Sequence, residues 1–89
     1  MTPAEGEAIV GMLRDRDGRL TLIHLADGRQ CRVFNIVWGR DMAAEFDHIT
    51  TNISPSVETE AIDFFHTDQV RRVADADTGR VLFEDNPSN

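Results

Sequence analysis

Short turn signals at close spacing constrain the fold more than any other feature of this sequence. Asp17-Gly18 and Asp27-Gly28 each separate two runs of β-prone residues, and Gly79 ends a third signal, DADTG. An Asp-Gly pair supplies the positive φ that a tight hairpin turn requires. The spacing therefore predicts antiparallel strands joined by short turns. We place these strands at about 8–14, 19–25 and 29–38, and at about 70–74 and 80–84.

The segment between these hairpins predicts two further strands. HITTNI at 48–53 is β-branched and alternating, SPS breaks it, and AIDFFH at 61–66 is short and apolar. Thr67 is placed to cap a single helical turn through TDQV. The segment GRDMAAEF at 39–46 contains helix-forming residues, but it is too short to stand alone as a helix.

These elements predict a small all-β fold of six to seven short antiparallel strands with one short helical turn. A length of 89 residues predicts a single domain, 1–89, with an ordered body at about 7–84 and loose termini at 1–6 and 85–89. The order of elements looks like that of the SH3-like and Sm-like small barrels, and a compact sandwich is the alternative. This likeness covers no diagnostic motif, so it implies no activity.

Composition excludes several classes of function. All nine basic residues are arginine, so the chain has no lysine for Schiff-base chemistry or for a phosphate-binding loop. The net charge of −7 disfavours nucleic-acid binding, because the phosphate backbone would be repelled. No apolar run approaches the roughly 20 residues that span a bilayer, which predicts a protein without a membrane role. The single cysteine and the lack of a signal-like leader predict a cytoplasmic protein.

The negative charge is concentrated in the middle of the chain. Residues 41–70 contain seven acidic residues and no arginine. Such a run is typical of a solvated loop surface, but it also describes an acidic docking face that would select a basic protein partner. The sequence leaves both interpretations open.

The central predicted strand has apolar side chains on both faces. Side chains alternate with a period of two, so Phe34, Ile36 and Trp38 share one face while other apolar residues occupy the opposite one. A strongly bent strand, with one half packed in the core and the other half at a corner of the fold, would explain this pattern. The other explanation is association into a homodimer or small homo-oligomer. The residues predicted to form that interface are Ile23, Cys31, Val33 and Val37.

A polar cluster in FDHITTNISP, next to Trp38 and Arg40, is the candidate ligand-binding site. Its aromatic residues would form an apolar wall and its arginine would bind an anion. An exposed strand with cross-strand threonine pairs is the structural alternative. The candidate residues are Trp38, Arg40, Asp47, His48, Thr50, Asn52, Phe64 and His66.

The sequence offers only a weak case for catalysis. His48 and His66, with Asp47 or Asp68, have the side chains of a metal or acid-base site, but no motif such as HExxH ties them together. His24 and Cys31 are typical of packed strand residues. We therefore predict a non-catalytic, self-associating interaction or ligand-binding module without a cofactor. A small metal- or acid-base-dependent enzyme is the alternative.

Overall fold

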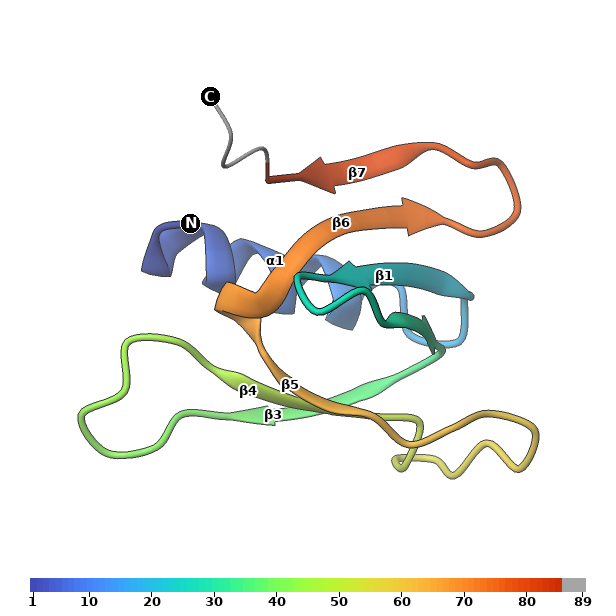
Figure 1. Ribbon diagram of the computed structural model, residues 1–89. Coiled ribbons are helices and arrows are strands. Elements are labelled where there is room, and N and C mark those ends of the chain that lie inside the picture. The colour runs from blue at the N-terminus through green and yellow to red at the C-terminus, as the bar shows by residue number, and fades with distance from the viewer. Residues whose placement is uncertain (86–89) are drawn as a thin grey trace.

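The computed structural model describes residues 1–85 and shows two antiparallel β-sheets and one α-helix (Figure 1). The elements are α1 (Pro3–Asp15), β1 (Thr21–Leu25), β2 (Gln30–Val33), β3 (Ile36–Gly39), β4 (His48–Thr51), β5 (Phe64–His66), η1 (Thr67–Gln69), β6 (Val70–Asp75) and β7 (Val81–Glu84). The four-stranded sheet has the order β2-β1-β6-β7, and the three-stranded sheet has the order β3-β4-β5. The predicted small, mostly β fold is confirmed, but within residues 1–85 the strands do not close into a barrel.

Two predicted hairpins are confirmed. β1 pairs with β2 across Asp27-Gly28, and β6 pairs with β7 across the turn that ends at Gly79. Gly28 and Gly79 have φ values of 92° and 77°, in the region that favours glycine. Both turns were predictable because the local backbone geometry alone determines their residue types.

The first predicted strand, 8–14, is wrong, because this segment belongs to helix α1. Thr2 and Glu5 form a capping box: the Thr2 hydroxyl accepts from the Glu5 N–H at 3.2 Å, and the Thr2 N–H donates to Glu5 Oε1 at 2.8 Å. Pro3 occupies the first turn, where its missing N–H costs nothing. Residues 3–6 are therefore helical rather than loose, and Asp17-Gly18 connects a helix to a strand instead of forming a hairpin. In the predicted loose end at 85–89, Asp85 is held by its N–H, which donates to the Arg71 carbonyl at 2.8 Å, and residues 86–89 lie outside the described part of the chain.

The predicted strand at 29–38 is two strands in different sheets. It breaks at Phe34-Asn35, where β2 ends and the chain turns into β3. Cys31, Val33 and Ile36 are consequently all buried in the same core. The break explains why the predicted strand at 29–38 had apolar residues on both faces: its two halves belong to different strands.

The segment 39–46, which contains helix-forming residues but is too short to stand alone as a helix, forms an irregular loop after Gly39, between β3 and β4. Arg40 Nε donates to Asp47 Oδ1 at 2.8 Å and closes the loop at its base. Ala43 has a φ of 67°, which no α-helix accommodates. Eight residues without tertiary support cannot sustain a helix, so the ion pair and the turn determine the conformation.

One hydrophobic core connects the helix with both sheets. Ile9 and Leu13 of α1, Ile23 of β1, Ile49 of β4 and Phe65 of β5 are each at most 2% exposed. Figure 1 shows the three-stranded sheet below the four-stranded one, and the core contains residues of both sheets. The opposite face of the three-stranded sheet is therefore left to solvent.

The predicted helical turn after β5 is confirmed as η1, but Thr67 does not cap it. Gln69 Oε1 accepts from the His66 N–H at 2.8 Å, whereas Thr67 Oγ1 has no hydrogen-bond partner among residues 1–85. Thr67 is fully buried beneath α1. A Cβ at Gly6 would lie only 2.6 Å from Thr67 Oγ1, so the helix can approach η1 only with glycine at position 6.

Gly6→Ala is expected to destabilise the protein by about 1–2 kcal/mol, because overpacking outweighs the better helix propensity of alanine. Gly11→Ala is the matched control, since a Cβ at Gly11 meets nothing within 4 Å. The control is expected to stabilise the protein by about 0.5–1 kcal/mol. Urea unfolding followed by circular dichroism measures both effects. Adding Thr67→Ala to Gly6→Ala should recover part of the loss, and equal effects of the two glycine substitutions would contradict this explanation.

Candidate functional site

Four of the predicted site residues meet on the solvent side of the three-stranded sheet. The register pairs His48 with His66 and Thr50 with Phe64, so these side chains project from the same face. The ring centroids of His48 and Phe64 are 5.6 Å apart, and those of Phe64 and His66 are 5.5 Å apart. Val37 lies opposite Thr50 on β3 and completes the set. We call Val37, His48, Thr50, Phe64 and His66 the outer face.

The outer face exposes aromatic and apolar surface beside a polar group that lacks a partner. Phe64 is 53% exposed and Val37 is 41% exposed. His48 Nδ1 is buried without a hydrogen-bond partner among residues 1–85, and His48 Nε2 lies 3.7 Å from Asp41 Oδ1. A cluster of exposed apolar side chains with a polar margin is typical of an interaction surface.

Acidic residues without cationic partners lie in the segments that adjoin this sheet. Asp47 and Glu60 are bound by arginines at 2.8 Å and 2.7 Å. Four other acidic residues between positions 41 and 70 form no ion pair with any arginine of residues 1–85. These four acids, which we call the acidic rim, are Asp41, Glu45, Glu58 and Asp68. The rim is therefore available to positive charges from outside the chain.

Two predicted site residues form an ion pair with each other. Arg40 donates to Asp47 and also approaches Glu7 Oε1 at 3.1 Å, which ties the β3-β4 loop to helix α1. These two contacts use two of the five N–H donors of the Arg40 guanidinium. In the structure this pair closes the loop, and ligand binding by Arg40 and Asp47 stays a prediction.

Trp38 lies on the opposite side of β3 from Val37, since the two are adjacent in the strand. The guanidinium carbon of Arg14 lies 4.6 Å from the centroid of the Trp38 ring. This is the geometry of a cation–π contact between the helix and the sheet. Trp38 is therefore not part of the outer face.

Asn52 is buried and structural. Its Nδ2 donates to the carbonyls of Arg32 and Ala61, each at 2.8 Å, and its Oδ1 accepts from the Phe34 N–H at 2.8 Å. The residue is 1% exposed and has a φ of 63°. Its amide holds the chain at the break between β2 and β3, so it is not a ligand-binding residue.

The enzyme alternative gains no supporting geometry. His48 and His66 are neighbours, with ring centroids 6.2 Å apart, but Asp47 is held by Arg40. Within residues 1–85, no three His, Cys, Asp or Glu side chains are arranged to hold a metal ion. Burial, and then the nearby Asp63 carboxylate, raise the pKa of Cys31 to about 11. Its sulfur is a thiol at neutral pH rather than a nucleophilic thiolate.

The structure corrects three of the four predicted interface residues. Ile23, Cys31 and Val33 are 0%, 1% and 2% exposed, because they pack in the core of their own chain. A second copy could not contact them without unfolding the domain. Val37 remains on the surface, as part of the outer face. Self-association itself stays a prediction.

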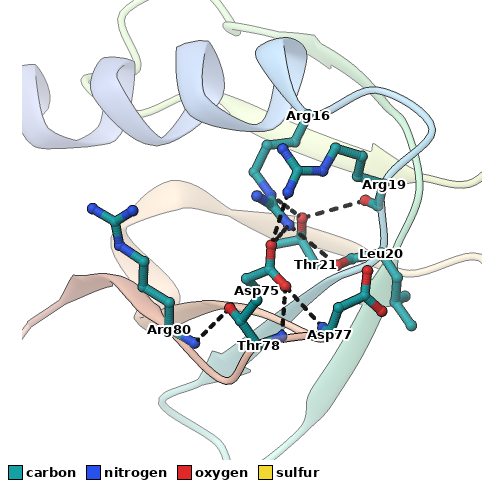
Figure 2. A network of polar contacts seen from close by, with 8 residues as sticks. All are labelled: Arg16, Arg19, Leu20, Thr21, Asp75, Asp77, Thr78 and Arg80. Atoms are coloured by element: carbon teal, nitrogen blue, oxygen red, sulfur yellow. Dashed lines mark hydrogen bonds and ion pairs between the residues drawn. The ribbon is translucent and has the colours of Figure 1, made fainter.

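A second polar cluster, which we call the Asp75 network, was not predicted from the sequence (Figure 2). Asp75 Oδ2 accepts from Arg16 at 2.9 Å and from Arg19 at 3.1 Å. Asp75 Oδ1 accepts from the backbone N–H groups of Asp77 and Thr78 at 2.8 Å and 3.0 Å. The hydrogen bond from Thr78, followed by that from Arg16, lowers the pKa of Asp75 to about 2. With four donors on one carboxylate, the network joins the end of α1 to the β6-β7 turn and leaves no position for a ligand.

An apolar groove of about 560 Å³ separates α1 from β7, away from the outer face. Its lining residues are Ala8, Gly11, Met12, Asp15, Arg16, Arg80, Val81 and Leu82. None of them was a predicted site residue. The sequence carried no signal for the groove, because its two walls are about 70 residues apart in the chain.

Comparison with protein-family models, curated proteins and solved structures gave no match. In the part of the chain that the structure describes, no helix has the length and apolar character needed to cross a bilayer.

Proposed function

We propose that the protein is a non-catalytic interaction module whose outer face binds an arginine- or lysine-rich segment of a partner protein. The observation that carries the proposal is the half-exposed Phe64 ring, which stacks on His48 and meets His66 edge-on, with Asp41 of the acidic rim 3.7 Å from His48. Aliphatic and aromatic side chains of the partner would cover Phe64 and Val37. Its cations would approach the rim.

The chain itself contains a precedent for this chemistry. Arg14 stacks on Trp38 at 4.6 Å on the other side of the same sheet. An arginine from a partner stacked on Phe64 would make the equivalent contact, which contributes about 0.5–2 kcal/mol depending on desolvation. The acidic rim would accelerate association with a basic segment and repel acidic ones.

Three expectations from the sequence remain part of this proposal. The net charge of −7 favours a protein partner over a nucleic acid. The cytoplasm is the expected compartment, where a buried free thiol such as Cys31 persists without oxidation. The likeness to SH3-like or Sm-like barrels adds no function to the proposal.

Fluorescently labelled peptides provide the test. A peptide of alternating arginine and leucine is expected to bind, and a matched peptide of glutamate and leucine is not, as measured by fluorescence anisotropy. Added salt is expected to weaken binding, because the rim contributes through exposed charges. Phe64→Ser should weaken binding by about ten-fold or more, the effect of losing a central aromatic contact.

Val81→Ser is the matched control for the peptide experiment. Val81 is 40% exposed but belongs to β7, so its loss leaves the outer face intact. This variant is expected to bind the arginine-leucine peptide like the unaltered protein. Equal binding by Phe64→Ser, or tighter binding of the glutamate-leucine peptide, would refute the proposed function.

A further inference from the structure

Strand β7 forms an open edge of the four-stranded sheet. β6 is its only neighbouring strand within residues 1–85, so its other edge has no strand partner there (Figure 1). Proteins usually block such edges with proline, lysine or a strand bulge that turns the edge away, because an open edge can pair with another chain. The sequence Arg80-Val-Leu-Phe-Glu84 has neither proline nor lysine. β7 does contain one irregularity: Val73 pairs with Phe83 and Ala74 with Val81, so Leu82 is an extra residue in the edge strand. Val81, next to it, is still 40% exposed.

The groove between α1 and β7 extends this surface with apolar side chains. Val81 and Leu82 form one wall, and Gly11 and Met12 of the helix lie on the other. A strand added beside β7 would find both backbone hydrogen-bonding groups and an apolar surface. This combination is how extended segments bind to sheet edges in other proteins.

Arg80, at the end of the groove, is the unpaired cation of this surface. Within residues 1–85, each of the other eight arginines has a carboxylate within 4.0 Å or, for Arg14, an aromatic ring. The Arg80 side chain makes no such contact, and Figure 2 shows it pointing away from the Asp75 network. In a chain with 16 acidic residues, an arginine left without a partner points to a negative group from outside.

We infer that the occupant is β7 of a second copy of this chain, paired antiparallel about a two-fold axis. β7 follows Arg80 and ends at Glu84, which is 57% exposed and only loosely paired with Arg72 at 3.5 Å. A two-fold axis through the middle of β7 brings the first residues of one strand beside the last residues of the other. Arg80 then lies near Glu84 of the partner subunit, and this contact forms twice. A parallel arrangement would place like charges side by side.

The dimer joins two four-stranded sheets edge to edge. A strand of four residues and its flanking groove bury less surface than a stable dimer needs. We therefore expect a weak dimer that forms only at high protein concentration. The inference does not depend on the proposed function, because β7 and the outer face belong to different sheets. Failure of one leaves the other intact.

Reversing the charge of Arg80 or of Glu84 tests the inference. Sedimentation equilibrium measures the mass in solution over about a hundred-fold range of protein concentration. The unaltered protein is expected to shift from one-chain to two-chain mass as concentration rises. Arg80→Glu and Glu84→Arg are each expected to remain monomeric, because each places like charges together across the axis. An equimolar mixture of the two variants is expected to form dimers again, because both contacts are then between opposite charges.

Circular dichroism checks that both variants fold, and Phe64→Ser serves as a control that should dimerise normally. The inference is overturned if the unaltered protein keeps one-chain mass at the highest concentration. It is equally overturned if either single variant dimerises like the unaltered protein, if the mixture remains monomeric, or if Phe64→Ser abolishes the dimer.

Discussion

Asn52→Ala is expected to lower the free energy of unfolding by about 4 kcal/mol, since three buried hydrogen bonds are lost and their backbone partners stay buried. Those partners are the Phe34 N–H and the carbonyls of Arg32 and Ala61. Alanine at a φ of 63° adds strain that asparagine tolerates better. Chemical denaturation, followed by the fluorescence of Trp38, measures the loss. An effect of this size removes a large part of the stability of a typical domain.

Asn52→Gly separates the two contributions to that loss. Glycine adopts the positive φ freely but has no amide, so it isolates the cost of the missing hydrogen bonds. We expect the glycine variant to be about 1 kcal/mol more stable than the alanine variant and still far less stable than the unaltered protein. A glycine variant with normal stability would show that Asn52 serves backbone conformation alone.

Asp75→Asn is expected to lower the melting temperature by about 10 °C at neutral pH, because it leaves two arginines without their carboxylate. Asp75 titrates near pH 2 in the folded protein, against an ordinary pKa of 3.8. A lowered pKa in the folded state means that the carboxylate stabilises the protein fully above pH 3.8. This contribution is lost as the pH falls from there through about 2. The difference in melting temperature between the two proteins should therefore shrink over that interval.

Asp77→Asn is the control for the Asp75 experiment. It removes the same charge from the same turn, but the Asp77 side chain is exposed and only its backbone N–H contacts Asp75. The melting temperature of this variant is expected to match that of the unaltered protein across the same pH range. A matching loss in both variants would mean that net charge, and not the Asp75 network, controls stability.

The parts of the fold that were predictable are those determined by residues close together in the chain. The β1-β2 and β6-β7 turns depend on Asp27-Gly28 and on DADTG, so the sequence was sufficient to place them. The helix was missed although Thr2, Pro3 and Glu5 signal its start, because Ile9 and Val10 favour strands. The Asp17-Gly18 pair, which is typical of a hairpin turn, also favoured a strand at 8–14 over a helix.

The candidate site was less predictable, because it depends on register and distant partners. His48, Thr50, Phe64 and His66 were all candidate site residues in the sequence, but only the register of β4 and β5 shows that they share a face. The structural roles of Arg40 and Asn52 were missed because nothing local reveals that Glu7 and Ala61 occupy some of their hydrogen-bonding groups. The contact between Arg16 and Asp75 spans 59 positions and left no trace in the local pattern.

That same span affects how the protein emerges during synthesis. A helix of 13 residues has marginal stability alone in water. Beyond the contacts of Arg16 with Leu20 and Thr21, the C-terminal end of α1 is anchored by Asp75, in the turn of residues 75–78. The newly made N-terminal segment therefore has to wait, with its apolar stripe uncovered, until that turn has left the ribosome. For most of translation, a chaperone would meet this chain as an exposed amphipathic peptide rather than as a folded intermediate.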